Sequence, residues 1–407
     1  MTDDANRHGR KPRARLRAIH PLGVRFALEV GDRPTVIGRL TGGDDTPSLR
    51  HGTVSRRHFE LHWNDPRGCH VGHDLGSHNG SRVDGQSTGP AGSELRDGSV
   101  LQLGDVSLVY EVLPPDAPAT PPSLVARTPL VDPGLELPTR PRGPSSASAD
   151  ARIGEWLPNP PLPGDAPASE ALRRTVQRVA TESLPVLLHG ERGAGKQRVA
   201  HELHRLSGRS GALVVVPCSR LEPDRPSHPD PADHIEALLT SATDGTLFLD
   251  GVDGLPAPAW TALRRALAQQ GLEPGSSPCS VRLVASIPDG CTLDPERREA
   301  LAGIELRVPP LRERRGDLLV WLEQLYTHWL QQRPDEPIET LTLSPEAVER
   351  VLLHPWHDNL RELDRLVHEL ASDPDLPRPI PLPRLPAWLL RSSAATTMPV
   401  AGPPKEG

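Results

Sequence analysis

Lysine is almost absent from this sequence. Of its 46 Lys and Arg residues, only Lys11, Lys196 and Lys405 are lysines. A genome that favours arginine accounts for the general bias. Lys196 is the only one of the three that lies away from the ends of the 407-residue chain, so it is a candidate for a role that arginine does not fill.

Other features are scarce or missing. Aromatic residues make up 3% of the chain, and its four cysteines include no CxxC pair, so their spacing predicts no metal site. No apolar run approaches the roughly 18–20 residues of a membrane span, and none follows the basic start "RHGRKPRAR" as in a secretory signal. The formal charge of −7 gives no general attraction to nucleic acid. We therefore expect a cytoplasmic protein with reduced thiols, no membrane partner and no direct DNA binding.

Residues 15–113 are predicted to form an all-β sandwich. Short runs rich in β-branched, aromatic and other apolar residues alternate with clusters of Gly, Asp, Asn and Ser, which is typical of short strands joined by turns. The runs are VRFALEV, PTVIGRL, HFELHW, SRVDG, VLQLG and VSLVYEV. Residues 1–14, which precede them, are expected to be a basic, disordered tail.

Proline is abundant, with 48 residues, and marks the segments that build no core. Residues 114–167 are rich in Pro, Ala and Ser and are predicted to form an extended linker. Residues 376–407 have a similar composition and are expected to be a disordered tail, with no further folded domain.

Residues 168–325 alternate between helical and strand patterns. The helical stretches are SEALRRTVQRVA, KQRVAHELHRLSG and APAWTALRRALAQQ, and the strands are LPVLLHG, ALVVVPC, GTLFLD and SVRLVAS. Alternation of this kind predicts a doubly wound parallel sheet. Residues 326–375 are predicted to add a small helical lid. The fold class is therefore multidomain, with an all-β sandwich followed by an α/β domain.

The segment GERGAGKQ, residues 190–197, has the spacing GxxxxGK of a phosphate-binding loop. It follows the strand PVLLH and opens a helix, which is the context that such a loop requires. Glycines allow backbone N–H groups to converge on phosphate oxygens, and Lys196 is placed to reach the terminal phosphates. The alternative is a glycine-rich turn with an incidental lysine. Asp250 ends the buried strand GTLFLD, where a carboxylate suits a phosphate-bound Mg²⁺.

Four segments in this order resemble the AAA+ ATPase domain of sigma-54 enhancer-binding transcription activators. They are LLHGERGAGKQRVAHELHRLSGR, GTLFLD, LRVPPLRER and DNLRELDRLV. The resemblance implies ATP with Mg²⁺ as the cofactor, AAA+ relatives as candidate partners, and Asp250 as the residue that meets Mg²⁺ through ATP. The nucleotide-binding residues that it implies are Gly190, Glu191, Gly193, Gly195, Lys196, Gln197, Asp250 and the sensor-like Arg361.

The sequence departs from this family at the groups that support hydrolysis. The glutamate that orients the attacking water maps to Gly251, and the sensor asparagine maps to Pro288. The trans-acting arginine fingers map to Asp294 and Ala300, with Arg297 and Arg298 close enough to substitute for them. Asp253 is an alternative stand-in for the missing glutamate. We therefore expect ATP to bind, assign no catalytic residue, and expect weak or absent ATPase activity.

Two parts of the sigma-54 activators are also missing from this sequence. The GAFTGA loop, which contacts sigma-54, is replaced by a shorter, Pro-rich segment between Cys218 and Asp250. No helix-turn-helix follows residue 373, which also supports the expectation of no direct DNA binding.

The N-terminal region resembles a forkhead-associated (FHA) domain, a fold that binds phosphothreonine. The resemblance covers nearly all of residues 15–113 and depends on VIGR, VSRRH, DLGSHNGSRVDG and LRDGSVLQLG. A guanidinium and a hydroxyl are suitable donors to a phosphate dianion. The resemblance implies a phosphothreonine-containing protein as partner, His58 as a structural brace, and a binding set of Arg39, Ser55, Arg56, His78 and Asn79. Other histidines scatter over the strands without a common face, so a metal site is not predicted.

Together these observations predict a cytoplasmic signalling or transcription-regulatory protein that reads phosphothreonine and binds ATP. The main alternative is an active AAA+ ATPase that acts as a sigma-54-dependent regulator. A third interpretation is an interaction protein that has lost nucleotide binding, which the presence of Lys196 disfavours.

Overall fold

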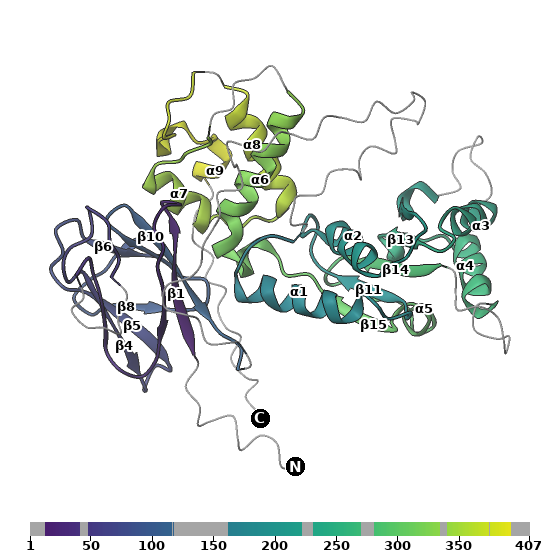
Figure 1. Ribbon diagram of the computed structural model, residues 1–407, viewed down its shortest axis with the longest axis horizontal. Coiled ribbons are helices and arrows are strands. Elements are labelled where there is room, and N and C mark those ends of the chain that lie inside the picture. The colour runs from purple at the N-terminus through teal and green to yellow at the C-terminus, as the bar shows by residue number, and fades with distance from the viewer. Residues whose placement is uncertain are drawn as a thin grey trace, which may run out of the picture. The chain divides into compact units, whose positions relative to one another are not determined.

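The computed structural model describes residues 13–40, 48–115, 117, 162–221, 231–269, 281–333, 340–373 and 375–391. The chain divides into two compact units. The first comprises residues 1–127, 337–356 and 366–407, and the second comprises residues 128–336 and 357–365. Figure 1 shows the helices and strands of both units.

The first unit contains a sandwich of two antiparallel sheets. One sheet has six strands in the order β2-β1-β10-β9-β6-β7, and the other has four in the order β3-β4-β5-β8. The strands are β1 (Ala14–His20), β2 (Ala27–Val30), β3 (Thr35–Ile37), β4 (Phe59–Asn64), β5 (Cys69–Asp74), β6 (Ser81–Val83), β7 (Gln86–Ser87), β8 (Ser93–Leu95), β9 (Val100–Leu103) and β10 (Val106–Val112). The predicted all-β sandwich is thereby confirmed.

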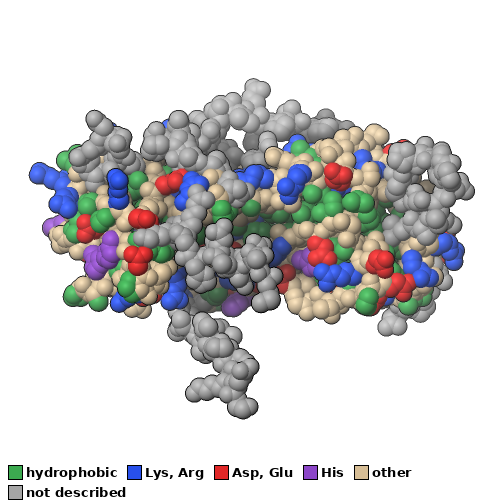
Figure 2. All heavy atoms as spheres, turned by 90° about the horizontal axis from the view of Figure 1, so that it is seen from below, with side chains coloured by type: hydrophobic (Ala, Val, Ile, Leu, Met, Phe, Trp, Pro, Cys, Tyr) green, Lys and Arg blue, Asp and Glu red, His purple; other side chains and the backbone are tan. Residues whose placement is uncertain are grey.

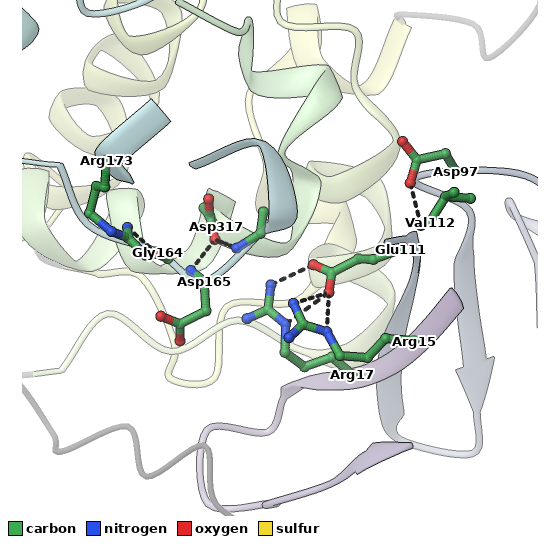
Figure 3. Close-up of polar contacts among 10 residues, drawn as sticks. Arg15, Arg17, Asp97, Glu111, Val112, Gly164, Asp165, Arg173 and Asp317 are labelled. Carbon is green, nitrogen blue, oxygen red and sulfur yellow. Dashed lines mark hydrogen bonds and ion pairs between the residues drawn. The ribbon is translucent and has the colours of Figure 1, made fainter. Parts of the chain in front are cut away.

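Strand β1 was not among the predicted strands, although it lies in the middle of the larger sheet. Its inward residues Ala14 and Leu16 join the sandwich core, while Arg15 and Arg17 point to the opposite face. Both arginines donate to the carboxylate of Glu111 on β10, at 2.8 and 2.6 Å (Figure 3). All three side chains of this ion cluster are buried. Only Ala14 of this strand lies in the basic tail predicted for residues 1–14. The shared partner of the two arginines on β10 accounts for their burial.

The first unit also contains helical elements from the C-terminal part of the chain. These are α7 (Pro345–Leu353), η6 (Leu382–Arg384) and α9 (Ala387–Arg391), while α8 (Leu360–Ala371) contributes to both units. Leu343 forms a β-bridge with Ile380, and the Arg350 guanidinium donates to the Leu389 carbonyl at 2.6 Å. The expectation of a disordered tail from residue 376 is therefore wrong as far as Arg391, because long-range hydrogen bonds anchor this segment. Residues 392–407 lie outside the described part.

The second unit contains a parallel sheet in the order β12-β13-β14-β11-β15. Its strands are β11 (Val186–His189), β12 (Leu213–Pro217), β13 (Thr246–Asp250), β14 (Arg282–Ile287) and β15 (Ile304–Arg307). Its helices are α1 (Pro167–Val179), α2 (Lys196–Leu206), α3 (Pro231–Ser241), α4 (Ala257–Gln269), α5 (Pro295–Leu301) and α6 (Leu318–Gln331), with short helices η2 (Cys218–Leu221), η3 (Val252–Gly254), η4 (Leu311–Glu313) and η5 (Arg315–Asp317).

The two faces of this sheet carry separate apolar clusters. Leu247 and Leu249 of β13 face a cluster that includes residues of α3 and α4, whereas Phe248 faces one that includes residues of α1 and α2. Helices on both faces of a parallel sheet define the doubly wound architecture, and the predicted α/β fold is confirmed. This arrangement brings the carboxyl ends of β11, β13 and β14 to the same edge.

The predicted boundaries of the α/β domain need two adjustments. Leu162 is buried in the same cluster as α1, so the last residues of the expected linker 114–167 belong to the second unit. Helix α6 runs across residue 325, where the lid was expected to begin. Residues 118–161, the main part of the linker, lie outside the described residues.

The surface carries charges of both signs, as expected for a chain with 46 basic and 53 acidic residues. Figure 2 shows basic and acidic side chains interspersed on the face that it draws. Among the described residues, none of the helices is both apolar and long enough to span a bilayer.

Candidate nucleotide and phosphopeptide sites

The phosphate loop connects β11 to α2 and has the backbone geometry that its glycines allow. Gly193 has a φ of 72° and Gly195, the N-cap of α2, has a φ of 102°, both in the left-handed region. A β-carbon on Gly193 would lie 2.1 Å from the Asp358 carbonyl oxygen. The loop therefore needs glycine at 193 for both conformation and space, and it directs the N-terminus of α2 toward the site.

Lys196 is the first residue of α2, and its side chain folds back over the loop. Its Nζ donates to the carbonyl oxygens of Gly190 at 2.6 Å and Glu191 at 3.0 Å. The pKa of this lysine is lowered because the side chain is partly buried, and the nearby charge of Arg361 adds to this effect, while Asp250 opposes it. The lysine is thus held at the loop, among charged groups from three other segments.

Asp250 ends β13 at the same edge of the sheet. Its carboxylate accepts a hydrogen bond from the Ser286 hydroxyl on β14 at 2.5 Å. The next residue, Gly251, donates its N–H to the Ser286 carbonyl at 3.1 Å and has a φ of 76°. At the position where the resembling family carries glutamate, the backbone is therefore left-handed, which disfavours any residue with a side chain.

Carboxylates gather around the lysine, and sequence reasoning identified only some of them. Asp250, Asp289 and Asp253 all lie close enough to raise the pKa of Lys196. Asp289 was missed, although it follows the end of β14 just as Asp250 ends β13. Carboxylate oxygens are ligands that suit Mg²⁺ bound to nucleotide phosphates, so Asp250 at this edge fits the expected ion. Within the described ranges, no group of three or more His, Cys, Asp or Glu residues could hold a metal by itself.

The Glu191 side chain has structural partners within the second unit. Its carboxylate accepts hydrogen bonds from the Arg312 guanidinium and from the Asn359 amide, the latter at 3.1 Å. The pKa of Glu191 is lowered by the hydrogen bond from Arg312, against the opposing effect of burial. The side chain therefore fixes the loop, and it is the Glu191 carbonyl that meets Lys196. Gln197, the other polar candidate here, lies one residue further along α2.

Asn359 connects three segments at the loop. Besides Glu191, its amide donates to the Arg192 carbonyl at 3.0 Å, and its Oδ1 accepts from the Leu311 N–H at 2.8 Å. It is fully buried and has a φ of 52°, a conformation that asparagine tolerates. The next residue, Leu360, donates its N–H to the Gly193 carbonyl at 3.1 Å. The start of α8, with Arg361, is thereby fixed against the phosphate loop.

The segment from Leu311 to Asp317 extends the support. Arg314 donates to the Ala194 carbonyl of the loop at 2.7 Å. Asp317 is fully buried, and its Oδ1 accepts from the N–H groups of Asp165 and Ala166 at 2.8 and 2.9 Å (Figure 3). A β-carbon at Gly164 would lie 2.1 Å from the Asp317 carboxyl carbon. One short segment thus forms hydrogen bonds both to the phosphate loop and to Asp165 and Ala166, the residues just before α1.

Replacing Asn359 by glycine is expected to lower the free energy of unfolding by about 3 kcal/mol, because three hydrogen bonds, one buried and two partly buried, lose a partner at about 1 kcal/mol each. Glycine keeps the left-handed backbone, so the change removes the side chain alone. Urea unfolding monitored by tryptophan fluorescence measures the effect. Asp358→Ala is the matched control. The Asp358 side chain is exposed, and its ion pair with Arg192 is long, at 3.9 Å, so its loss should cost little. Equal stability of both variants would show that Asn359 does not brace the loop.

The two candidate substitute arginines are both engaged with nearby groups. Arg297 forms an ion pair with Asp294 at 3.2 Å and lies 5.4 Å from the ring centroid of Trp260. Arg298 pairs with Glu305 at 2.8 Å. Pro288, at the sensor position, comes directly after β14 and has no side-chain donor.

In the sandwich, the predicted phosphopeptide-binding residues lie on loops joined by hydrogen bonds. The Arg39 N–H donates to the Ser55 carbonyl at 2.8 Å, and the Ser55 hydroxyl accepts from the His78 N–H at 3.0 Å. The Asn79 amide donates to the Thr53 carbonyl at 2.7 Å. The loops with Arg39, with Ser55 and with His78 and Asn79 therefore meet at one end of the sandwich. The Arg39 side chain is exposed there.

His58 and Asp74 brace this end from beneath. His58 is fully buried; its Nδ1 accepts from the Ser55 N–H at 3.0 Å, and its Nε2 lies 3.1 Å from the Gly80 carbonyl oxygen, to which it donates. Burial lowers the pKa of His58, which favours this neutral form. Asp74 accepts from the N–H and hydroxyl of Ser77, both at 2.7 Å. The loops are thus held by one fully buried group, His58, and one partly buried group, Asp74.

Arg56 and Thr53 also lie at this end of the sandwich. Arg56 is exposed, and its carbonyl accepts the Leu40 N–H at 3.2 Å, which places its backbone beside Arg39. Thr53 was not predicted, yet its hydroxyl accepts from the Asp105 N–H at 2.9 Å and its carbonyl accepts from Asn79. It ties the loop after β9 to the candidate site, and a short polar residue in a loop gave no sequence signal for that role.

Comparison with known proteins adds two family matches. A model of the sigma-54 interaction domain matches residues 164–311, and a model of the FHA domain matches residues 35–104. These ranges contain the phosphate loop and most of the sandwich.

Individual relatives match mainly through the second region. The chain is 31% identical over 255 residues to the DNA-binding transcriptional regulator NtrC of Rhizobium meliloti (strain 1021), covering 57% of this chain and 50% of the relative. It is 31% identical over 261 residues to the sigma54-dependent transcriptional activator SfnR of Pseudomonas putida, covering 58% and 66%. The chain is 26% identical to NtrX from Brucella abortus, whose crystal structure was determined in complex with ATP. The match covers 56% of this chain and 57% of the NtrX chain, with a TM-score of 0.48. The chain thus spans about half the length of NtrC relatives that it matches.

Proposed function

Because the chain carries an FHA domain and a sigma-54 interaction domain, we propose that it is a phosphothreonine-reading regulatory protein whose second domain binds Mg-ATP but hydrolyses it weakly or not at all. One observation carries the proposal: Lys196 and Asp250 lie at an intact phosphate loop, while Gly251 holds a left-handed backbone where the family has its glutamate. We place this activity in the cytoplasm.

In this proposal each residue has a defined role toward ATP. The loop N–H groups and Lys196 contact the phosphates, and Arg361, fixed beside Gly193, approaches them from α8. Asp250 would hold Mg²⁺ together with the bound nucleotide, and the ion would supply neutralisation of phosphate charge. Gly251, which follows Asp250, has no side chain to orient water, and Asp253, whose Oδ1 lies 3.8 Å from where a β-carbon at Gly251 would stand, is the alternative group. Arg297 and Arg298 are engaged within their own domain, and arginine fingers are worth about 10³–10⁵ in rate in other NTPases.

The FHA domain supplies the second role. Arg39, Ser55 and Arg56 offer donors to a phosphothreonine phosphate, and Asn79 contacts the ligand backbone after release from Thr53. The expected partner is a protein that carries phosphothreonine. The chain then acts as a scaffold or as a modulator of AAA+ relatives, and it does not bind DNA directly.

We expect ATP to bind saturably while phosphate release stays at the buffer background. The test is a nucleotide titration run beside a continuous phosphate-release assay, with Asp250→Asn as the variant. Steady release that Asp250→Asn abolishes would favour the alternative, an active AAA+ ATPase. That alternative is favoured by the sigma-54-dependent relatives, so the assay distinguishes two specific candidates.

A further expectation concerns transcription. In a purified system with sigma-54 RNA polymerase and this protein as the only activator, open complexes should form no more often than without it. The reason is the missing GAFTGA segment between Cys218 and Asp250. Potassium permanganate footprinting measures the open complex, and an intact activator of the family serves as the positive control. ATP-dependent melting by this chain alone would contradict the expectation.

A further inference from the structure

The larger sheet of the FHA domain contacts a helix from far along the chain. Helix α7 lies against strands β9 and β10, within the first unit. Figure 1 shows α7 beside β10. The Arg82 guanidinium on β6 forms an ion pair with Glu349 of α7 at 2.8 Å. Next to it, a β-carbon at Gly85 would lie 3.2 Å from Leu353 Cδ1. The turn after β6 therefore packs closely on the end of α7.

The Glu349 carboxylate is unusually placed for a helix surface. Its side chain is 5% exposed, whereas that of Arg82 is 44% exposed. Burial raises the pKa of Glu349, and the charge of Arg82 opposes the shift. Removing one partner of a buried ion pair is strongly destabilising, whereas a surface pair contributes little. Because the Glu349 carboxylate is buried, replacing Arg82 would leave that carboxylate without its ion-pair partner and weaken the packing of α7 on the sheet.

Strand β6 connects this contact to the ligand end of the sandwich. It begins at Ser81, two residues after Asn79, and Ser81 pairs with Leu103 beside the loop that meets Thr53. At its other end, Asp84 accepts from the Ser99 hydroxyl at 2.9 Å and from the Val100 N–H at 2.8 Å. The three residues from Asn79 to Arg82 span about 10 Å of extended chain. A short, firmly paired strand thus has the ligand loop at one end and the α7 contact at the other.

Helix α7 has its own connection to a functional segment. It ends at Leu353, and six residues later the chain reaches Asn359, whose amide bonds Glu191 and Arg192 of the phosphate loop. The Oδ1 of Asn359 accepts a hydrogen bond from the Leu311 N–H. Six residues of chain thus connect the end of α7 to a residue that supports the phosphate loop.

We propose that the face of the FHA domain around Arg82 and Gly85 is the docking surface for helix α7 of the same chain, and that this docking couples phosphothreonine binding to nucleotide binding. The docking rests on the contacts above, while the coupling rests also on the proposed function. By linkage, each ligand then changes the affinity for the other by the same factor.

Docking is tested first without any ligand. A protease site inserted between Ser145 and Ser146 allows the full-length folded protein to be cut, and gel filtration then reports whether the halves stay together. The wild type should co-elute at micromolar concentration, while Arg82→Glu raises the dissociation constant at least tenfold. Glu349→Gln should weaken association in the same direction, and Arg82→Glu with Glu349→Arg should restore it. Arg67→Glu, which reverses an exposed arginine paired with Glu94 on the other sheet, is the control.

Separation of the wild-type halves, or elution of Arg82→Glu and Glu349→Gln as for Arg67→Glu, would overturn the docking. Coupling is measured in the uncut chain as the ATP affinity with and without a saturating phosphothreonine peptide. We expect a change of about fivefold or more in the wild type, lost in Arg82→Glu. Equal ATP affinities in the wild type would overturn the coupling. If no peptide binds to any variant, the proposed phosphothreonine reading fails and the coupling fails with it, while the cutting experiment still decides the docking.

Discussion

Replacing Lys196 by alanine is expected to weaken ATP binding on the order of a hundredfold. The ammonium group lies at the loop, 2.6 Å from the Gly190 carbonyl oxygen, and can exchange that contact for phosphate oxygens when a nucleotide is present. Hydrogen bonds to charged groups contribute about 1.5–3 kcal/mol, and 1.4 kcal/mol corresponds to a tenfold change in affinity. Calorimetric titration with Mg-ATP measures the effect.

The control for Lys196 is another basic residue of the same loop. Arg192 is 75% exposed and lies 3.9 Å from Asp358, so Arg192→Ala should leave the affinity within about twofold. A similar loss in both variants would mean that only the general positive charge of the loop matters. Unchanged binding in Lys196→Ala would remove the main support for a specific nucleotide site and would favour a pure interaction protein.

Replacing Arg39 by alanine is expected to lower the affinity for phosphothreonine peptides by roughly 10- to 150-fold. A phosphate carries about −1.5 to −2 charges at pH 7 and offers three strong acceptors, and losing a charged hydrogen bond costs about 1.5–3 kcal/mol. The Arg39 backbone is held by Ser55, so the substitution removes the guanidinium without freeing the loop. Calorimetry against a phosphothreonine peptide library provides the measurement.

Arg96→Ala is the matched control for Arg39. Its side chain is 77% exposed, and its loop precedes β9, whereas the loop that meets Thr53 follows β9. We expect this variant to bind as the wild type does, and the unphosphorylated peptides to bind to neither. Phosphopeptide binding that survives Arg39→Ala would show that this sandwich uses another surface.

The structure changes the interpretation of several candidate residues without moving the site. The AAA+ resemblance implies Glu191 as a nucleotide ligand, but its carboxylate pairs with Arg312 and Asn359, which makes it a support for the loop. Arg297 and Arg298, the candidate substitutes for arginine fingers, pair with Asp294 and Glu305. The structure strengthens the argument from Gly251 against hydrolysis, because the left-handed backbone at this position would strain a glutamate placed there.

Local patterns in the sequence determined the two folds and the positions of their candidate sites. The GxxxxGK spacing between a strand and a helix located the phosphate loop, and the strand–helix alternation predicted the doubly wound sheet. The four FHA segments located Arg39, Ser55 and Asn79. These features could be found because each depends on residues close together in the chain, where glycine conformation, turn chemistry and side-chain periodicity act directly on the backbone.

Tertiary structure alone decided which distant residues support those sites. Arg312 and Asn359 meet Glu191 from positions 121 and 168 residues away, and Arg82 meets Glu349 across most of the chain. No local sequence pattern predicts any of these pairs. From the sequence alone, an arginine or a glutamate on a helix or strand is expected to be exposed to solvent, and only the packing of another element shows otherwise. Burial turns such charges into specific partners, because a charge removed from water must be matched by a group that only the folded chain brings near.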